Sequence, residues 1–263
     1  MYAFEYHRPT TVRQAIGALK KVSEPKLMAG GQTLLPTMKQ RLASPENLID
    51  LGAIDGMDKI ELKGRTLHVG AMATHASVAS SDVVKEAIPG LAALAGGIGD
   101  PHVRHRGTIG GSIANNDPAA DYPAACLGIG ATIHTNERKI AADDFFVDMF
   151  ETALNENEII TKVSFPIPKR CAYQKFANPA SRYAIVGVLV SKRGKEVRVA
   201  VTGAASSVFR WTEAEEVLSA RYKSKSLDGL TLPADDMNAD LHASAEYRAH
   251  LVGVMAKRAV DAS

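Results

Sequence analysis

Two glycine-rich segments constrain this chain more than any other feature. The first reads AGGQTL at residues 29–34, and the second reads GTIGGSIAN at residues 107–115. Paired glycines before a helix expose successive backbone N–H groups, and the helix N-terminus adds partial positive charge, so such a loop can hold phosphate without a basic side chain. A tight turn is the simpler interpretation of either pair alone. Two pairs, each flanked by hydroxyl side chains, favour a phosphate site divided between two loops.

Other chemical motifs are missing. There is no G-x-x-x-x-G-K-[ST], and the nearest match to G-x-G-x-x-G, at residues 97–102, lacks the third glycine and has Pro101 where a helix should begin. His102 and His105 are three residues apart, but no carboxylate or cysteine completes a metal site, and the proline and glycines argue against a helix there. No G-x-S-x-G elbow occurs. We therefore predict no catalytic residue and no metal ligand on this chain, and expect a cofactor to carry any reaction.

The composition is that of a globular protein. The 263 residues are 46% hydrophobic, and 31 basic against 29 acidic side chains leave a formal charge of +2. A net charge this close to zero does not indicate a nucleic-acid-binding protein, which needs basic surface to contact the phosphate backbone. The N-terminus carries charges where a signal peptide needs apolar residues, and no run approaches the roughly 18 apolar residues of a membrane span, so we expect a cytoplasmic protein. The isolated cysteines, Cys126 and Cys171, predict neither a disulfide nor an iron–sulfur site and are expected in the core.

Periodicity and turn residues predict an α+β chain in three parts, residues 1–55, 56–170 and 171–263. The first contains a helix at 12–21 opened by a Thr11/Gln14 capping box, strands at 26–29 and 47–51, and a helix after the first glycine loop. The second contains hairpins at 59–69 and 131–140, helices at 76–80 and 83–95, an irregular stretch at 99–123 and a strand at 159–165. The third contains a three-stranded antiparallel sheet at 173–176, 184–192 and 197–205, and then helices opened by a Thr212/Glu215 capping box and by Ser244.

Two segments that include these loops carry a family resemblance. The sequences AGGQTLLPTMKQRL at 29–42 and TIGGSIANNDPAADYPA at 108–124 resemble the flavin-binding signatures of the FAD-carrying medium subunit of molybdenum hydroxylases, such as aerobic carbon monoxide dehydrogenase and the xanthine dehydrogenases. The resemblance spans the whole chain. It implies two lobes that bind FAD between them, in the fold shared with vanillyl-alcohol oxidase, and a C-terminal domain.

The resemblance also assigns cofactor-binding residues. It implies that the two loops hold the pyrophosphate through backbone N–H groups, that Asp121 bonds the adenosine portion, and that Lys175 lies near the flavin ring, where its charge stabilises the reduced anionic flavin. Without the resemblance, the sequence pattern predicts that Lys175 is a solvent-exposed lysine on a strand. Ser112 stands where family members commonly have Asn, and we expect FAD binding to survive this change. The implied set is Ala29, Gly30, Gly31, Gln32, Thr33, Leu34, Thr108, Ile109, Gly110, Gly111, Ser112, Asn115, Asp121 and Lys175.

The resemblance implies an electron-transfer role within a complex. A large molybdopterin subunit would hydroxylate the substrate, a small subunit with [2Fe-2S] clusters would carry the electrons, and FAD on this chain would pass them to an external acceptor, in a dimer of heterotrimers. The alternatives are a free-standing FAD-dependent oxidoreductase of the same fold and a flavin-free scaffold. The sequence selects neither substrate nor acceptor. We expect Gly31→Val or Gly110→Val to abolish FAD retention and leave the fold largely intact.

Overall fold

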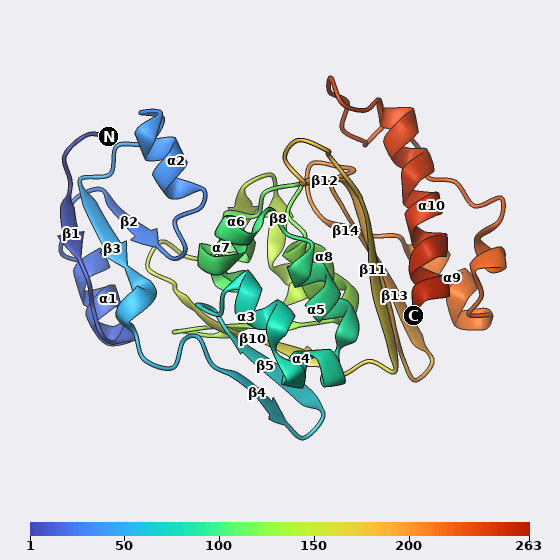
Figure 1. The fold of residues 1–263 in the computed structure, drawn as a ribbon, viewed down its shortest axis with the longest axis horizontal. Helices are drawn as coiled ribbons and strands as arrows, with labels where there is room; N and C mark the ends of the chain where they lie inside the picture. Colours follow the sequence, from blue (N-terminus) through green and yellow to red (C-terminus); the bar gives the residue numbers. More distant parts are fainter.

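A computed structural model describes all 263 residues. Figure 1 shows the N-terminal lobe, the central lobe and the C-terminal sheet with its helices side by side along the longest axis. The fold combines helices and sheets, as predicted. None of its helices has the length and hydropathy of a membrane span.

The N-terminal lobe is a three-stranded parallel sheet of order β1-β3-β2 with one helix before and one after β2. The predicted cap is present, because the Thr11 hydroxyl accepts from the N–H of Gln14, although the Gln14 amide oxygen accepts from the N–H of Thr10 rather than of Thr11. The elements are β1 (Glu5–His7), α1 (Val12–Leu19), β2 (Pro25–Met28), α2 (Leu34–Lys39) and β3 (Asn47–Asp50).

The central lobe is built on an antiparallel five-stranded sheet of order β4-β5-β10-β6-β7, with helices packed on one face. Its last strand, β10, pairs with β5 of one predicted hairpin and with β6 of the other, so the sheet forms only when residues far apart in the sequence meet. The elements are β4 (Ile60–Lys63), β5 (Thr66–Gly70), α3 (His75–Ser80), α4 (Asp82–Ala87), α5 (Pro89–Gly96), α6 (Pro101–Arg106), α7 (Ile109–Asn115), α8 (Tyr122–Ile129), β6 (Thr132–Thr135), β7 (Lys139–Ala141), β8 (Phe146–Asp148), β9 (Glu151–Thr152) and β10 (Ile160–Pro166).

Two helix predictions in this lobe were wrong. The single helix expected at 83–95 is divided into α4 and α5 at Ile88, which precedes a proline and leaves the helical region. The stretch at 99–123 expected to be irregular contains α6, α7 and the start of α8. Pro101 begins α6 instead of preventing it, because proline is well suited to the first helical position and the Asp100 carboxylate accepts from the N–H of Val103.

The C-terminal sheet has four antiparallel strands, not the three predicted. The missed strand, β14, is only two residues long and pairs with β13, so it left no alternating pattern in the sequence. The expected Thr212 cap is absent, since Trp211 precedes α9 and the Glu215 carboxylate instead accepts from the N–H of Val199 and from Arg210. The elements are β11 (Arg170–Ala177), β12 (Ala184–Arg193), β13 (Glu196–Thr202), β14 (Phe209–Arg210), α9 (Thr212–Ala220) and α10 (Ala245–Ala262), the last capped by Ser244 as predicted.

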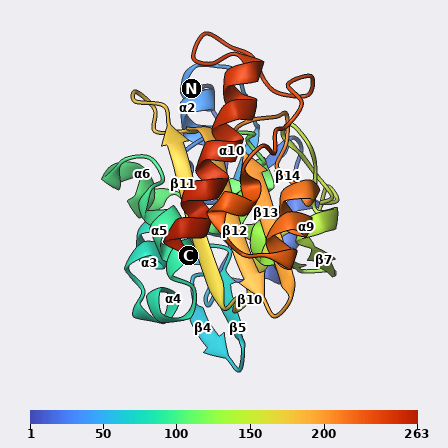
Figure 2. The same ribbon diagram turned by 90° about the vertical axis from the view of Figure 1, so that its right-hand side faces the viewer.

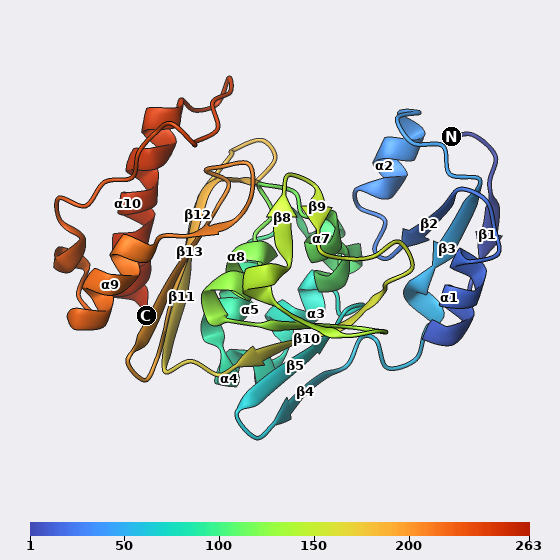
Figure 3. The same ribbon diagram turned by 180° about the vertical axis from the view of Figure 1, so that it is seen from behind.

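This sheet lies between two helical layers. Helices α9 and α10 cover its outer face (Figure 2), where Val188 and Val190 join one apolar cluster, while Leu189 faces α8 in the main core. At Gly128 of α8 a Cβ would lie 2.6 Å from the end of the Leu189 side chain, so the glycine lets α8 approach β12 without displacing that side chain. Viewed from behind, α7 and the β8–β9 hairpin lie on the side of the central lobe nearer the N-terminal lobe (Figure 3).

Candidate functional site

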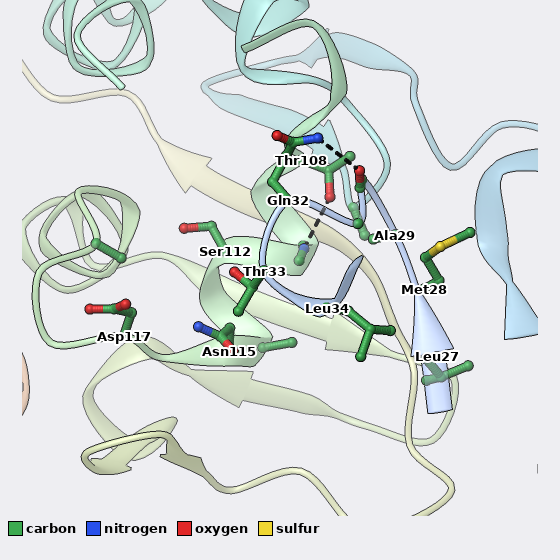
Figure 4. A pocket seen from close by; sticks show the side chains of 18 of the residues that line it. Leu27, Met28, Ala29, Gln32, Thr33, Leu34, Thr108, Ser112, Asn115 and Asp117 are labelled. Carbon is green, nitrogen blue, oxygen red and sulfur yellow. Dashed lines mark hydrogen bonds between the residues drawn. The ribbon is translucent and has the colours of Figure 1, made fainter. Parts of the chain in front are cut away.

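A cavity of about 720 Å³ is lined by all three parts of the chain. Both glycine-rich loops contribute to its wall, together with the β8–β9 turn and a loop of the C-terminal sheet. Figure 4 shows the loop after β2 and the start of α7 facing one another across part of this site. Volumes of roughly 300–1,000 Å³ are typical of small-molecule and cofactor sites.

The first loop presents a row of amide donors. The backbone N–H groups of residues 30–34 have no acceptor anywhere in the chain, and all five residues line the cavity. Gly31 adopts a positive φ of 72°, and α2 then begins at Leu34 without a side-chain cap, so the orphan donors of the helix N-terminus are left available. Successive free amides before a helix form a site for an anion, and above all for phosphate oxygens.

The second loop uses its amides differently from our expectation. Ile109 and Gly110 donate to the carbonyls of Ala73 and Ala71, while Gly111 and Ser112 donate to the hydroxyl and carbonyl of Thr108. The first two bonds hold the start of α7 against the residues that follow β5, and the other two form the N-terminal cap of α7, so all four amides already have an acceptor. Besides Thr108, this segment contributes the side chains of Ser112 and Asn115 to the cavity, all three labelled in Figure 4.

Glycines bring the two loops together. A Cβ on Gly30 would lie 2.0 Å from the carbonyl oxygen of Arg106 and 2.8 Å from the Cα of Gly107, and one on Gly111 would lie 3.3 Å from the Cβ of Ala29. The first loop therefore needs Gly30 to reach the second, whereas a side chain at Gly111 would require only a small shift of Ala29. A Cβ on Gly110 would instead lie 2.6 Å from the backbone oxygen of Ala71. The expectation that Gly110→Val leaves the fold largely intact is therefore wrong, because the added side chain would meet the strand end at Ala71, although Gly110 also lines the cavity.

Most residues singled out in the sequence do line the cavity. Twelve of the fourteen do so, and the two exceptions are Ile109, which is fully buried, and Lys175. The twelve are Ala29, Gly30, Gly31, Gln32, Thr33, Leu34, Thr108, Gly110, Gly111, Ser112, Asn115 and Asp121.

Asp121 and Lys175 are joined to each other. The Lys175 ammonium lies 3.0 Å from the carboxylate of Asp121, whose side chain is 4% exposed, and the Tyr173 hydroxyl also donates to this carboxylate. Burial raises the pKa of Asp121, against the lowering effect of Lys175 and Tyr173. Lys175 is therefore not the solvated strand lysine that the sequence alone suggested.

Sequence reasoning missed the distant parts of the wall. Phe150 in the β8–β9 turn and residues 181–183 between β11 and β12 line the cavity from elements far from the glycine loops. His75 also lines it; burial lowers the pKa of this imidazole to about 4, so it is neutral at pH 7, and its Nδ1 has no hydrogen-bond partner. The local sequence shows only that Thr74 can cap a helix that begins at His75; it does not show that His75 lines a cavity.

The cysteines lie away from this wall. Cys126 is fully buried in α8, and burial raises the pKa of its thiol. Cys171 is partly buried and packs against the same core, and burial raises the pKa of its thiol to about 12. Both are therefore packing residues, as the sequence predicted.

The fold and site define a class of protein in which a cavity between lobes is lined by backbone amides that are free to bind an anionic ligand. The family model "FAD binding domain in molybdopterin dehydrogenase" matches residues 2–168, and the model "CO dehydrogenase flavoprotein C-terminal domain" matches residues 171–263. The chain belongs to this family of FAD-binding oxidoreductase subunits, and the resemblance seen in the sequence is confirmed.

Individual relatives align over nearly the whole chain. The nicotine 6-hydroxylase medium subunit of Paenarthrobacter nicotinovorans is 35% identical over 98% of this chain and 96% of its own length. A solved carbon monoxide dehydrogenase from Hydrogenophaga pseudoflava matches with a TM-score of 0.86 and 35% identity over 99% of this chain and 97% of that one. Quinoline 2-oxidoreductase from Pseudomonas putida 86 matches with a TM-score of 0.89 and 26% identity, over 99% and 96% of the two chains.

Proposed function

We propose that this chain binds FAD and acts as the electron-transfer subunit of a molybdenum hydroxylase complex. The observation that carries the proposal is the row of amides at residues 30–34, which have no acceptor in the chain and line a cavity reached by all three parts of the fold. Two phosphate groups offer several charged oxygens, and hydrogen bonds to charged acceptors are the strong ones. The donor set therefore fits a diphosphate.

The rest of the cavity also fits a dinucleotide. About half of its lining residues are hydrophobic, which suits planar rings, and Ser112 and Asn115 add short polar side chains beside the amides. We propose that residues 29–34 and Thr108, with these two side chains, hold the pyrophosphate, and that Asp121 bonds the adenosine portion. FAD supplies the redox chemistry. The chain's own residues bind it, orient it and keep water from part of its surface.

The names of the relatives support the complex. Several are called medium chains or subunits of dehydrogenases or hydroxylases, so their names place them beside other subunits. We propose that this chain likewise joins a large molybdopterin subunit and a small subunit with [2Fe-2S] clusters, as a dimer of heterotrimers in the cytoplasm. Electrons would reach FAD from the clusters and leave to an external acceptor. We also propose the division into lobes at 1–55 and 56–170 and a C-terminal domain at 171–263.

Purification of the chain alone tests the proposal. We expect a yellow protein with one FAD per chain and no turnover of small substrates, because the substrate site would lie on the large subunit. Turnover of a small substrate by the isolated chain would favour the free-standing oxidoreductase. A colourless protein that cannot be loaded with FAD would refute both flavin functions. Co-purification from the native cell then identifies the partner subunits.

A further inference from the structure

The turn after α5 collects three cationic side chains. The carbonyl of Gly97 accepts from the Lys175 ammonium at 2.8 Å, and the carbonyl of Gly99 accepts from Arg104 at 2.8 Å and from Arg182 at 3.2 Å. Gly97 is the C-cap of α5, and the last carbonyls of a helix have no partners within it and carry partial negative charge, so a cation is stabilised there. Arg104 belongs to the central lobe, whereas Lys175 and Arg182 come from the C-terminal sheet. The turn is therefore a junction between these two parts.

All three donors of the Lys175 ammonium are used within the chain. An ammonium group has three N–H bonds, and Lys175 donates to the carbonyl of Gly97, to the carboxylate of Asp121 and, at 3.0 Å, to the carbonyl of Arg182. Its side chain is 10% exposed and does not line the cavity. This arrangement places Lys175 behind the wall of the cavity, joining three segments of the chain.

One of those segments is the loop at residues 178–183, which we term the cavity loop. Asn178 closes it, since its N–H donates to the carbonyl of Tyr183 at 2.8 Å and its own carbonyl accepts from the N–H of Arg182 at 2.8 Å. Arg182 adopts a positive φ of 64°, and residues 181–183 line the cavity. The loop is ordered internally, and Lys175 and Arg182 bond it to the turn after α5.

We propose that Lys175 is a positioning residue that latches the cavity loop to the turn after α5, so that the C-terminal sheet supplies a fixed wall of the cofactor cavity. It acts through this loop, whose residues 181–183 line the cavity. The proposal rests on the proposed function only in that the cavity holds FAD. The latch, by which we mean the hydrogen bonds of Lys175 to Gly97, Asp121 and Arg182, is present in the chain without cofactor.

The test uses the full chain before FAD is added. Arg182 is a trypsin site, so the rate of cleavage there reports opening of the cavity loop. We expect Lys175→Met to raise this rate about tenfold or more and to weaken FAD binding, whereas Lys195→Met, at an exposed turn of the same sheet, leaves both unchanged. Lys175→Arg keeps a cation within reach of Gly97 and Asp121 and should restore most of the protection.

A double variant separates the latch from global stability. Lys175→Met leaves a buried carboxylate without its partner, and this lowers the thermal unfolding temperature. Adding Asp121→Asn removes that charge, so the unfolding temperature should recover while cleavage at Arg182 stays fast. Wild-type cleavage in Lys175→Met, or a shifted flavin midpoint potential with the loop still protected, would overturn the proposal. Failure of the wild-type chain to bind FAD would refute the proposed function and leave the cleavage result standing.

Discussion

Gly30→Ala probes the contact that brings the two glycine loops into one site. The added Cβ would lie 2.0 Å from the carbonyl oxygen of Arg106, and because this is a backbone atom, the loops must separate by about 1.4 Å to reach ordinary contact at 3.4 Å. Forced overpacking of this kind costs about 1–3 kcal/mol of stability. The same shift moves the amides of residues 30–34 away from the side chains of Ser112 and Asn115, so a diphosphate held by both groups loses part of its bonding.

The expected loss of affinity follows from those bonds. If two amides lose their charged acceptors, at about 1.5–3 kcal/mol each, the FAD dissociation constant rises by about 100-fold or more. Quenching of flavin fluorescence during titration of the apoprotein measures this. The matched control is Gly17→Ala, in the interior of α1 with no atom within 4 Å of the new Cβ, which should stabilise the chain by about 0.5–1 kcal/mol and leave FAD affinity unchanged. Wild-type affinity in a folded Gly30→Ala variant would refute the reasoning.

Two smaller changes test the site and the fold around it. Ser112→Ala removes a hydroxyl that lines the cavity and should weaken FAD binding by about threefold to tenfold in the same titration, with unchanged thermal stability; an unchanged dissociation constant would remove Ser112 from the site. Burial alone would raise the pKa of Glu158, but hydrogen bonds from Arg138 and from neighbouring groups lower it from 4.5 to about 2. A depressed carboxylate pKa stabilises the fold above the unfolded value and loses this effect as pH falls. Urea unfolding should therefore show Glu158→Gln less stable than wild type at pH 7, and this difference should shrink as the pH falls from 4.5 toward 2. The control variant Glu156→Gln, at an exposed position, should show no such trend. A pH-independent difference between Glu158→Gln and wild type would contradict the pKa assignment.

Local sequence patterns predicted the elements whose signals are local. The Thr11 cap, the glycine turn of the β4–β5 hairpin and the apolar spacing after the first glycine loop each report on a few neighbouring residues, and the structure has those elements. Misplaced elements had ambiguous local signals. Pro101 can end a helix or begin one, and the choice depends on Asp100 capping the new helix. The two residues of β14 are too few to show a period.

The site was predictable to the extent that it consists of loops with their own signature. Paired glycines mark both loops, but the sequence cannot show that the amides of Gly110 and Gly111 are already bonded to neighbouring residues while those of residues 30–34 are free. That difference depends on where the strand end at Ala71 lies, which is a tertiary contact. Phe150 and the cavity loop reach the wall through the packing of distant sheets, and no local pattern reports such packing.

Amide hydrogen exchange tests the central claim most directly. With residue-level detection by NMR, the chain is compared before and after it is loaded with FAD. The account predicts that exchange at residues 30–34 slows at least about tenfold on loading, because these amides gain acceptors, whereas the amides of residues 109–112 change little, since each is already bonded within the chain. Unchanged exchange at residues 30–34 in the loaded protein, or protection confined to residues 109–112, would contradict it.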